Sequence, residues 1–323
     1  MFTASKPLPA VLSRLRLPVI GAPLFIVSNP RLVIAQCTAG IVGSFPALNA
    51  RPQSQLDEWL HEITEAIAAH DRDHPDAPAA PFAVNQIVHR SNDRFEADMA
   101  TCAKWQVPIV ITSLGAREEL NHAVHGWGGI TLHDIIDDRF ARKAIDKGAD
   151  GLIAVAAGAG GHAGKWSPFA LIQEIRRWFG GPLILSGAIA TGRAVLAAQA
   201  MGADLAYIGT PFIATPEARA SDEYKQCIVA AGAADIVNSA LFTGIPGNYL
   251  RASIVAAGMD PDNLPPPGPD AMNFESASGA KAWRDIWGSG QGIGAIDAVV
   301  PAAELVDRLA REYAEAKARI CVQ

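Results

Sequence analysis

The sequence predicts an α/β fold, a (β/α)8 TIM barrel with a small helical lobe inserted near the C-terminal end. Short apolar runs alternate with helical patterns eight times, which is typical of a parallel sheet covered by helices. Several of these runs open into glycine and other small residues, as at the rim of a barrel. After about residue 220 the alternation stops. We therefore expect a barrel over 1–220, a lobe over 221–285 and a segment over 286–323 that returns to the barrel.

Each predicted strand is a short apolar run that is followed by a turn or a helical pattern. In a barrel of this kind, sites lie at the C-terminal ends of the strands. The eight runs are Pro18–Leu24, Gly40–Phe45, Phe82–Val88, Val107–Leu114, Gly129–Asp134, Gly151–Ala156, Pro182–Gly187 and Leu205–Phe212.

Capping residues mark several predicted helices. A hydroxyl or amide side chain followed by proline is a common helix start, and it occurs at Asn29-Pro30, Ser167-Pro168 and Thr215-Pro216. Thr191 is predicted to cap a helix over Arg193–Met201 that Gly202 ends. A last helix, Ala302–Ala318, has apolar residues four apart and is expected to pack back onto the barrel.

Composition argues against several classes of partner. The chain has 27 basic and 33 acidic residues, a formal charge of −6, and no basic run longer than two, so neither nucleic acid nor an anionic membrane is expected as a partner. Its four cysteines are scattered, which fits a reducing compartment. Neither a signal peptide nor a membrane span is evident, so a soluble, cytoplasmic protein is expected. A homo-oligomer is compatible with the sequence.

The most informative stretch is Ala157–Gly164, which follows the sixth predicted strand. Seven glycines and alanines around one histidine have no packing purpose, so another molecule is expected to come close to this backbone. Ser186-Gly187-Ala188 and Gly209-Thr210 follow the next two strands in the same way. Small residues after the seventh and eighth strands are typical of a phosphate site, which predicts a phosphorylated cofactor.

His162 is the candidate catalytic residue. It lies in the glycine-lined turn, where a proton acceptor would be useful. The rate on a substrate that must lose a proton is expected to rise with pH through the titration of this histidine, near its ordinary pKa of about 6.5. The alternative is a structural histidine. His133 and Asp134 end the fifth strand, and the sequence leaves their role open.

Several other chemistries lack their motif. No HExxH, CxxC or calcium loop occurs, so no metal is expected. No GxSxG nucleophile turn is present. The first strand ends in Gly21-Ala22-Pro23-Leu24 and not in GxGxxG, which disfavours a dinucleotide-binding domain.

The chain resembles the nitronate monooxygenase family, formerly called 2-nitropropane dioxygenases. These are FMN-dependent barrels whose close relatives act as NADH:quinone reductases and flavin-type enoyl-ACP reductases. The likeness spans nearly the whole chain, and its most specific element is the AGGHxG signature. The segments that carry it are 21–24, Val84-Asn85, 159–164, 186–193, 201–210 and Trp287–Gly292.

The resemblance implies one bound FMN and a set of site residues. His162 matches the catalytic base, and Gln291 would lie near the isoalloxazine. Gly187, Ala188, Gly209 and Thr210 match phosphate contacts, with Gly161 and Ser186 beside the cofactor, whereas Ala22, Pro23, Leu24 and Asn85 line the flavin.

The implied reaction is the oxidation of alkyl nitronates, or of nitroalkanes, by O2 to a carbonyl compound and nitrite, which is a detoxification. The expected partners are a small-molecule substrate and O2. One alternative is an NAD(P)H-dependent flavin reductase that acts on a quinone or an enoyl thioester. Another is a binding protein without turnover, which gains nothing from a base at His162.

Three positions depart from the family pattern. Asp134 stands where many members have a basic residue, Pro211 where an arginine often follows Gly-Thr, and Ala188 where the second glycine of Ser-Gly-Gly is usual. The phosphate turns are expected to survive these changes, whereas the identity of the substrate stays open.

Overall fold

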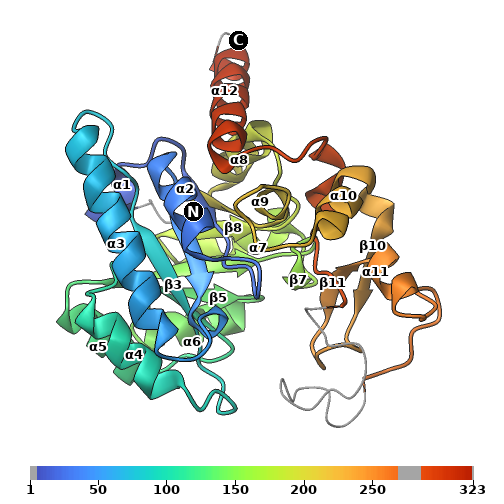
Figure 1. Cartoon of the computed structure of the whole chain (residues 1–323), viewed down its shortest axis with the longest axis horizontal. Helices are drawn as coiled ribbons and strands as arrows, with labels where there is room; N and C mark the ends of the chain where they lie inside the picture. Colours follow the sequence, from blue (N-terminus) through green and yellow to red (C-terminus); the bar gives the residue numbers. More distant parts are fainter. Residues whose placement is uncertain (1–5, 268–284, 322–323) are drawn as a thin grey trace.

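Eight short strands pair in parallel around a ring in the computed structural model, which describes residues 6–267 and 285–321 (Figure 1). The order around the ring is β1-β9-β8-β6-β5-β4-β3-β2, and a parallel bridge between Ile20 and Val42 joins β2 to β1. The predicted (β/α)8 barrel is confirmed. The strands are β1 (Val19–Gly21), β2 (Gly43–Pro46), β3 (Phe82–Ile87), β4 (Ile109–Ser113), β5 (Ile130–Ile135), β6 (Gly151–Val155), β8 (Leu183–Ser186) and β9 (Leu205–Ile208).

Each predicted apolar run overlaps one of these strands. β2 and β5 end one residue beyond their runs, whereas the first and last runs extend well past their strands. The first strand ends at Gly21, ahead of Pro23, which has no amide hydrogen to donate to a ladder. The last strand ends at Ile208 because α9 (Thr210–Ile213) begins two residues later, with Pro211 in its first turn.

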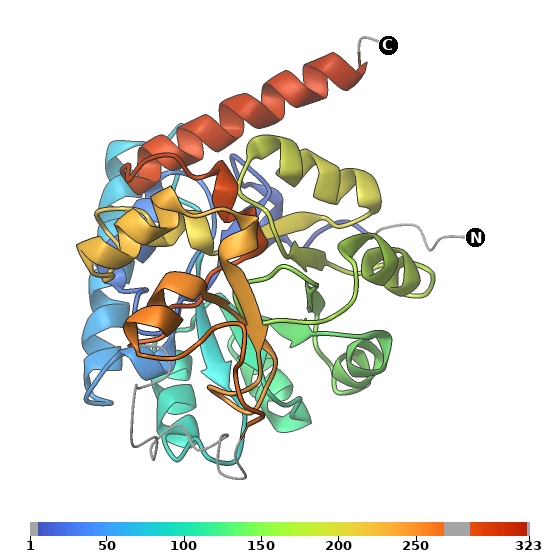
Figure 2. The same ribbon diagram turned by 90° about the vertical axis from the view of Figure 1, so that its right-hand side faces the viewer.

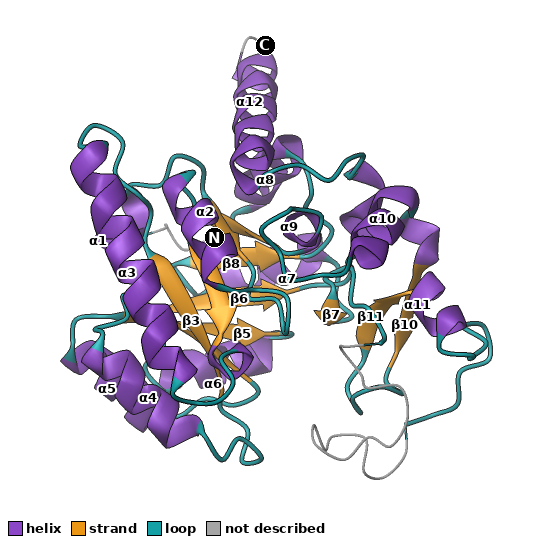
Figure 3. Cartoon of the chain, in the orientation of Figure 1, coloured by secondary structure: helices purple, strands orange, loops and turns teal. Residues whose placement is uncertain are grey.

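Helices surround the strands (Figures 2 and 3). Besides α9, the helices that accompany the strands are α1 (Ala10–Ser13), α2 (Pro30–Thr38), α3 (Gln55–Asp73), α4 (Phe95–Lys104), α5 (Glu118–Gly126), α6 (Asp138–Asp146), α7 (Pro168–Arg176), α8 (Gly192–Met201) and α12 (Ala302–Cys321).

Two predicted helix caps are present with their hydrogen bonds. Asn29 accepts from the amide of Leu32 at the start of α2, and Thr191 accepts from the amide of Ala194 at the start of α8. Gly202 ends α8 with a left-handed φ of 112°. The helix predicted after Thr215-Pro216 is wrong: the Thr215 hydroxyl donates back to the Phe212 carbonyl (2.9 Å), and a turn follows.

Helix α12 returns to the barrel as predicted and lies along α8 (Figure 2). Leu305 and Leu309 are buried there. The approach is close enough that a Cβ on Gly192 would clash with the Leu309 carbonyl oxygen. The Glu312 carboxylate accepts from the amide of Gly192 (2.7 Å), so it satisfies a free donor at the N-terminus of α8.

The lobe lies between α9 and α12, over the C-terminal ends of the strands, and it is not purely helical. Besides α10 (Asp222–Ala230) and α11 (Arg251–Ala256), it contains β10 (Ile236–Ser239) and β11 (Gly247–Leu250). β11 pairs with β10 and with β7 (Gly161–His162), a two-residue strand in the loop after β6 (Figure 3). Because β7 is remote in sequence, local patterns could not predict this sheet. Residues 268–284 of the predicted lobe lie outside the described residues.

Inward-pointing side chains fill the barrel in layers, as is usual for this fold. The lower layers are apolar, and Leu12 of α1 packs into the same cluster. Above them the inward positions become polar, with Asn85, Ser113 and Asp134 on three neighbouring strands. The apolar interior is formed by Ile20, Val42, Ala83, Ile109, Ile111, Leu132, Ile153, Ile184 and Leu205.

Candidate active site

A cavity of about 2190 Å³ opens between the C-terminal ends of the strands and the lobe. Ligand cavities are usually about 300–1,000 Å³, so this one can hold a cofactor together with a substrate. Every residue predicted for the site lines it, although the roles of these residues remain predictions. They are Ala22, Pro23, Leu24, Asn85, Gly161, His162, Ser186, Gly187, Ala188, Gly209, Thr210 and Gln291.

The turn after β8 has the backbone that a glycine pair would adopt. Gly187 has a φ of 141°, and Ala188 has a φ of 54°. The Ala188 amide donates to the Gly158 carbonyl (3.2 Å), which holds the turn against the loop after β6. Ala188 therefore keeps the left-handed conformation without being glycine, and this strain costs about 1–2 kcal/mol.

The turn after β9 brings Gly209 close to Leu24 and Ala22. A Cβ on this residue would lie 3.2 Å from Leu24 Cδ2 and 3.6 Å from the Ala22 Cβ, in the wall of the cavity. The two turns thus present small residues to one space, which fits the phosphate of a mononucleotide. The Thr210 hydroxyl accepts from the amide of Gly290 (2.9 Å), so its side chain also holds the C-terminal segment.

The C-terminal segment reaches the same cavity through close glycine packing. The Gln291 amide donates to the Gly158 carbonyl (2.9 Å), which also accepts from Ala188. A Cβ on Gly290 would lie 2.8 Å from that carbonyl oxygen. Glycine at 290 is what allows residue 291 to approach the loop that carries His162.

His162 is held by the lobe and does not lie in a loose turn. It pairs with Gly247 of β11, and its Nε2 lies 3.0 Å from Thr243 Oγ1. The Thr243 hydroxyl donates its one proton to the Ile245 carbonyl (3.2 Å), so we assign Nε2 as the donor to Thr243. This assignment puts the lone pair of the neutral ring on Nδ1.

Burial lowers the pKa of His162 to about 4, because the charged ring would lose water. The titration expected near 6.5 from the sequence is therefore wrong for this position. His162 is neutral throughout the physiological range, as a proton acceptor must be, but its low pKa also makes it a weak base.

A hydrogen-bonded chain crosses the upper barrel layer. Asn85 Nδ2 donates to Ser113 Oγ (2.8 Å), and Ser113 Oγ donates to Asp134 Oδ2 (2.6 Å). Burial raises the pKa of Asp134 to about 7, and the Ser113 hydrogen bond opposes this rise only in part. This carboxyl therefore changes its protonation state near neutral pH.

His133 lies on the other face of β5 and takes no part in this chain. Its Nδ1 is 2.5 Å from Thr112 Oγ1, and both side chains are buried. Burial and the nearby Lys143 lower the pKa of His133 to about 4. The two residues that the sequence left open thus differ: Asp134 points into the barrel, whereas His133 makes a contact between strands.

Sequence reasoning missed Thr243 and Asn248, which hold the histidine loop. Asn248 Nδ2 donates to the Ala159 carbonyl (2.6 Å), and Asn248 pairs with Gly161 across the small sheet. Neither residue belongs to a recognisable motif, and both lie more than 80 residues from the loop that they hold.

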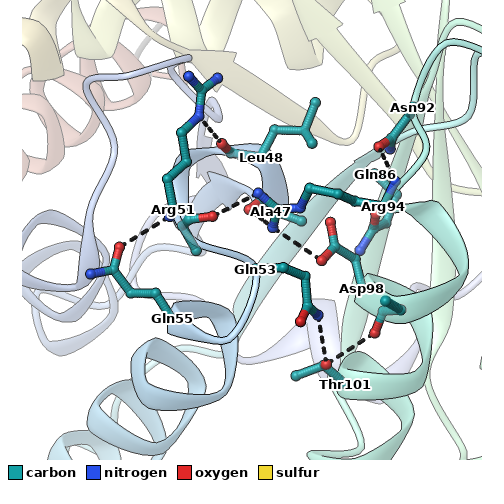
Figure 4. A network of polar contacts seen from close by, with 12 residues as sticks. Ala47, Leu48, Arg51, Gln53, Gln55, Gln86, Asn92, Arg94, Asp98 and Thr101 are labelled. Atoms are coloured by element: carbon teal, nitrogen blue, oxygen red, sulfur yellow. Dashed lines mark hydrogen bonds and ion pairs between the residues drawn. The ribbon is translucent and has the colours of Figure 1, made fainter.

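Arginines line the mouth of the cavity beside β2 and β3. Arg94 donates to the carbonyls of Ala50 (2.8 Å) and Ala47 (3.3 Å) and to Asp98 (3.1 Å), as Figure 4 shows for Ala47 and Asp98. Arg51 donates to the Leu48 carbonyl (3.0 Å) nearby. Both guanidinium groups are thereby positioned at the cavity, where they favour anionic ligands.

Two features are absent from residues 6–267 and 285–321. No group of three histidine, cysteine or acidic side chains is placed to hold a metal ion. None of the helices there combines the length and apolar character needed to cross a membrane.

The chain is similar to known proteins over most of its length. A family model described as nitronate monooxygenase matches residues 10–312. A nitronate monooxygenase of Paraburkholderia phytofirmans is 27% identical, over 91% of this chain and 92% of that protein.

Two further relatives differ in what their names describe. A (3aS,4S,5R,7aS)-5-hydroxy-7a-methyl-1-oxo-octahydro-1H-indene-4-carboxyl-CoA dehydrogenase of Rhodococcus jostii is 26% identical, over 74% of this chain and 64% of that protein. Among solved structures, a nitroalkane oxidase from Streptomyces ansochromogenes superposes with a TM-score of 0.81 at 23% identity, over 97% of this chain and 100% of that one. This last likeness supports the fold.

Proposed function

The chain belongs to the nitronate monooxygenase family and is an oxidoreductase, and from this premise we propose that it uses FMN to oxidise alkyl nitronates with O2 to a carbonyl compound and nitrite. The observation that carries the proposal is the convergence of His162 and two small-residue turns on one cavity. A nitronate and O2 are then its small-molecule partners.

The cavity fits a flavin mononucleotide. Gly187, Ala188, Gly209 and Thr210 would hold the phosphate. A Cβ on Gly187 would press against the Ala157 carbonyl oxygen, and one on Gly209 would lie against Leu24, so both turns need glycine to keep this backbone. Asn85 and Gln291, which line the same cavity, would contact the ring. Bound FMN supplies the electron transfer and the reaction with O2.

The protein groups favour an anionic substrate over a neutral nitroalkane. Removing an α-proton needs a base whose pKa lies near the working pH, and burial takes His162 far below it. A preformed nitronate needs no such step. Arg51, Arg94, Lys143 and Lys165 line the cavity and would draw in the anion. Neutral His162 would accept a hydrogen bond at Nδ1.

The test is to mix purified holoprotein with a preformed alkyl nitronate in air, without NADH, and to follow O2 uptake and nitrite. We expect both, with O2 consumption that does not increase when NADH is added. Flavin released by heat should have the mass of FMN. No nitrite with a nitronate in air would refute the proposed reaction, and a released FAD would refute the proposed cofactor.

A reductase that acts on a thioester is the second candidate. The Rhodococcus jostii relative is named as a carboxyl-CoA dehydrogenase, and the mouth of this cavity has exposed Trp166 with Lys165 Nζ 5.1 Å from its ring. An apolar and cationic rim suits a long anionic thioester. Rapid loss of flavin absorbance when NADH or NADPH is added without air would favour this candidate.

A further inference from the structure

Two polar atoms on the barrel floor lack a hydrogen-bond partner among the described residues. They are Asp134 Oδ1 and the Tyr207 hydroxyl, and both residues line the cavity. Tyr207 comes from β9 and is only 7% exposed. Buried polar atoms are nearly always paired, so two unpaired atoms on residues that line one cavity point to a ligand that would pair with them.

The Asp134 carboxyl is oriented for this purpose. Its Oδ2 accepts from Ser113 (2.6 Å), which itself accepts from Asn85 (2.8 Å), so three strands fix the side chain. Only Oδ1 remains for a ligand. A fixed carboxyl with one committed oxygen is a positioned donor when it is protonated, and a positioned negative charge when it is not.

Few charged side chains lie close to the Asp134 carboxyl among the described residues. The strands beside it present Ser113 from β4 and Val155 from β6, and β9 presents the Tyr207 hydroxyl, which is uncharged because burial and Asp134 raise its pKa. On β5 itself, the His133 side chain contacts Thr112, and Lys143 of α6 lies near enough to lower the pKa of His133.

The other titratable groups of the cavity lie outside this floor. His162 is on β7 and is neutral above about pH 4. Lys165 follows it toward the mouth, and Asp137 caps α6, where its carboxylate accepts from the amide of Phe140. Burial is the largest cause of the raised pKa of Asp134, with no cationic side chain to oppose it among its described neighbours.

We propose that Asp134 and Tyr207 are a donor pair for the oxygens of a small planar anion, and that Asp134 serves only in its protonated form. Each group then donates one O–H to the ligand, which satisfies both unpaired atoms. When Asp134 ionises, one donor disappears and a buried negative charge takes its place, so the anion is repelled. The inference rests on the proposed function in that a nitronate is such an anion.

The consequence is a pH-dependent affinity. Burial raises the pKa of Asp134 to about 7, so the pair is complete below this pH. Above it, each further pH unit reduces the protonated fraction about tenfold, and the dissociation constant rises by the same factor. Propanoate is a suitable probe, because its carboxylate is planar with two oxygens, stays ionised across the range and is not oxidised.

The experiment is calorimetric titration of the holoprotein with propanoate between pH 6 and 9. For the wild type we expect a dissociation constant that rises about tenfold per pH unit above 7. Asp134→Asn keeps an amide donor and cannot ionise, so its affinity should be flat and about 100-fold tighter than wild type at pH 9. Tyr207→Phe should weaken binding about tenfold without changing the slope.

Two control variants separate Asp134 from the other titratable groups. Asp93→Asn removes an exposed carboxylate from the mouth of the same cavity, and it should leave the slope as it is. His162→Asn should also keep the slope, since His162 is already neutral. Circular dichroism and flavin content check that each variant is folded and loaded.

The outcomes are decisive in both directions. A wild-type affinity that does not vary with pH, or a slope that persists in Asp134→Asn, would overturn the proposal. So would flat propanoate binding together with flavin absorbance that titrates near pH 7, because Asp134 would then contact the flavin. If the slope is found and vanishes in Asp134→Asn while no nitronate is oxidised, the anion site stands and the proposed function fails.

Discussion

Replacing Asp134 by asparagine should change how the stability of the protein without bound ligand depends on pH. The carboxyl has a pKa of about 7 in the folded protein, against an ordinary value of 3.8. A raised folded-state pKa means that the folded state binds the proton more tightly than the unfolded state. The stability that Asp134 contributes is therefore fully present below pH 3.8 and is lost as the pH rises through 7.

The magnitude follows from the difference between the two pKa values. Each pH unit is worth about 1.36 kcal/mol, so a difference of about three units corresponds to a loss of about 4 kcal/mol by pH 8. Water in the open cavity screens the ionised carboxylate, which makes this value an upper limit. Between pH 5 and pH 8 the loss is at most about 3 kcal/mol.

The assay is urea unfolding of the flavin-free wild type and of Asp134→Asn at pH 5, 6, 7 and 8. Asparagine can still accept the hydrogen bond from Ser113. A difference in the free energy of unfolding that is the same at every pH comes from other effects of the substitution. The quantity that tests the prediction is therefore the change of this difference with pH. We expect Asp134→Asn to gain up to about 3 kcal/mol relative to wild type from pH 5 to pH 8. Asp93→Asn is the control. A difference that stays constant with pH would refute the idea that burial holds this carboxyl near neutrality.

Three further substitutions test other parts of the site. Gly209→Val should abolish FMN retention while circular dichroism shows a folded barrel, because its side chain would fill the space beside Leu24; normal flavin occupancy would mean that the phosphate lies elsewhere. Ala188→Gly should raise the free energy of unfolding by about 1 kcal/mol, since the φ of 54° favours glycine, and an unchanged or lower urea midpoint would contradict the strain. His162→Asn should lower any activity on neutral nitroalkanes more than activity on preformed nitronates, but by less than the about 10²–10⁴ of a base with a matched pKa, whereas equal losses on both would make His162 a structural residue. In the wild type, the ratio of these two activities should not rise between pH 6 and 8, because the pKa of His162 is about 4.

Local patterns predicted the barrel well. The eight strands appear where apolar runs meet small residues, and the caps at Asn29 and Thr191 mark their helices, because these signals depend on neighbours within a few residues. Thr215 shows the limit of such signals. Its hydroxyl could cap a following helix or return to the Phe212 carbonyl, and the packing around α9 selected the second.

The cavity residues were predicted by a different route. The glycine-rich turns around His162, Gly187 and Gly209 are visible because glycine and alanine have no local reason to gather after a strand, and the family resemblance then supplied their expected roles. Their convergence on one cavity follows from parallel strands whose C-terminal ends share one rim.

By itself, then, the sequence predicted the barrel, the end of it at which a cavity forms and a histidine that lines this cavity, since periodicity and turn residues act over short distances. Tertiary structure alone decided the chemistry of that site. The small sheet that holds His162 is built from β7 and from β11, more than 80 residues later. The pKa values of His162 and Asp134 move in opposite directions because burial penalises the charge of each, and burial depends on the whole fold.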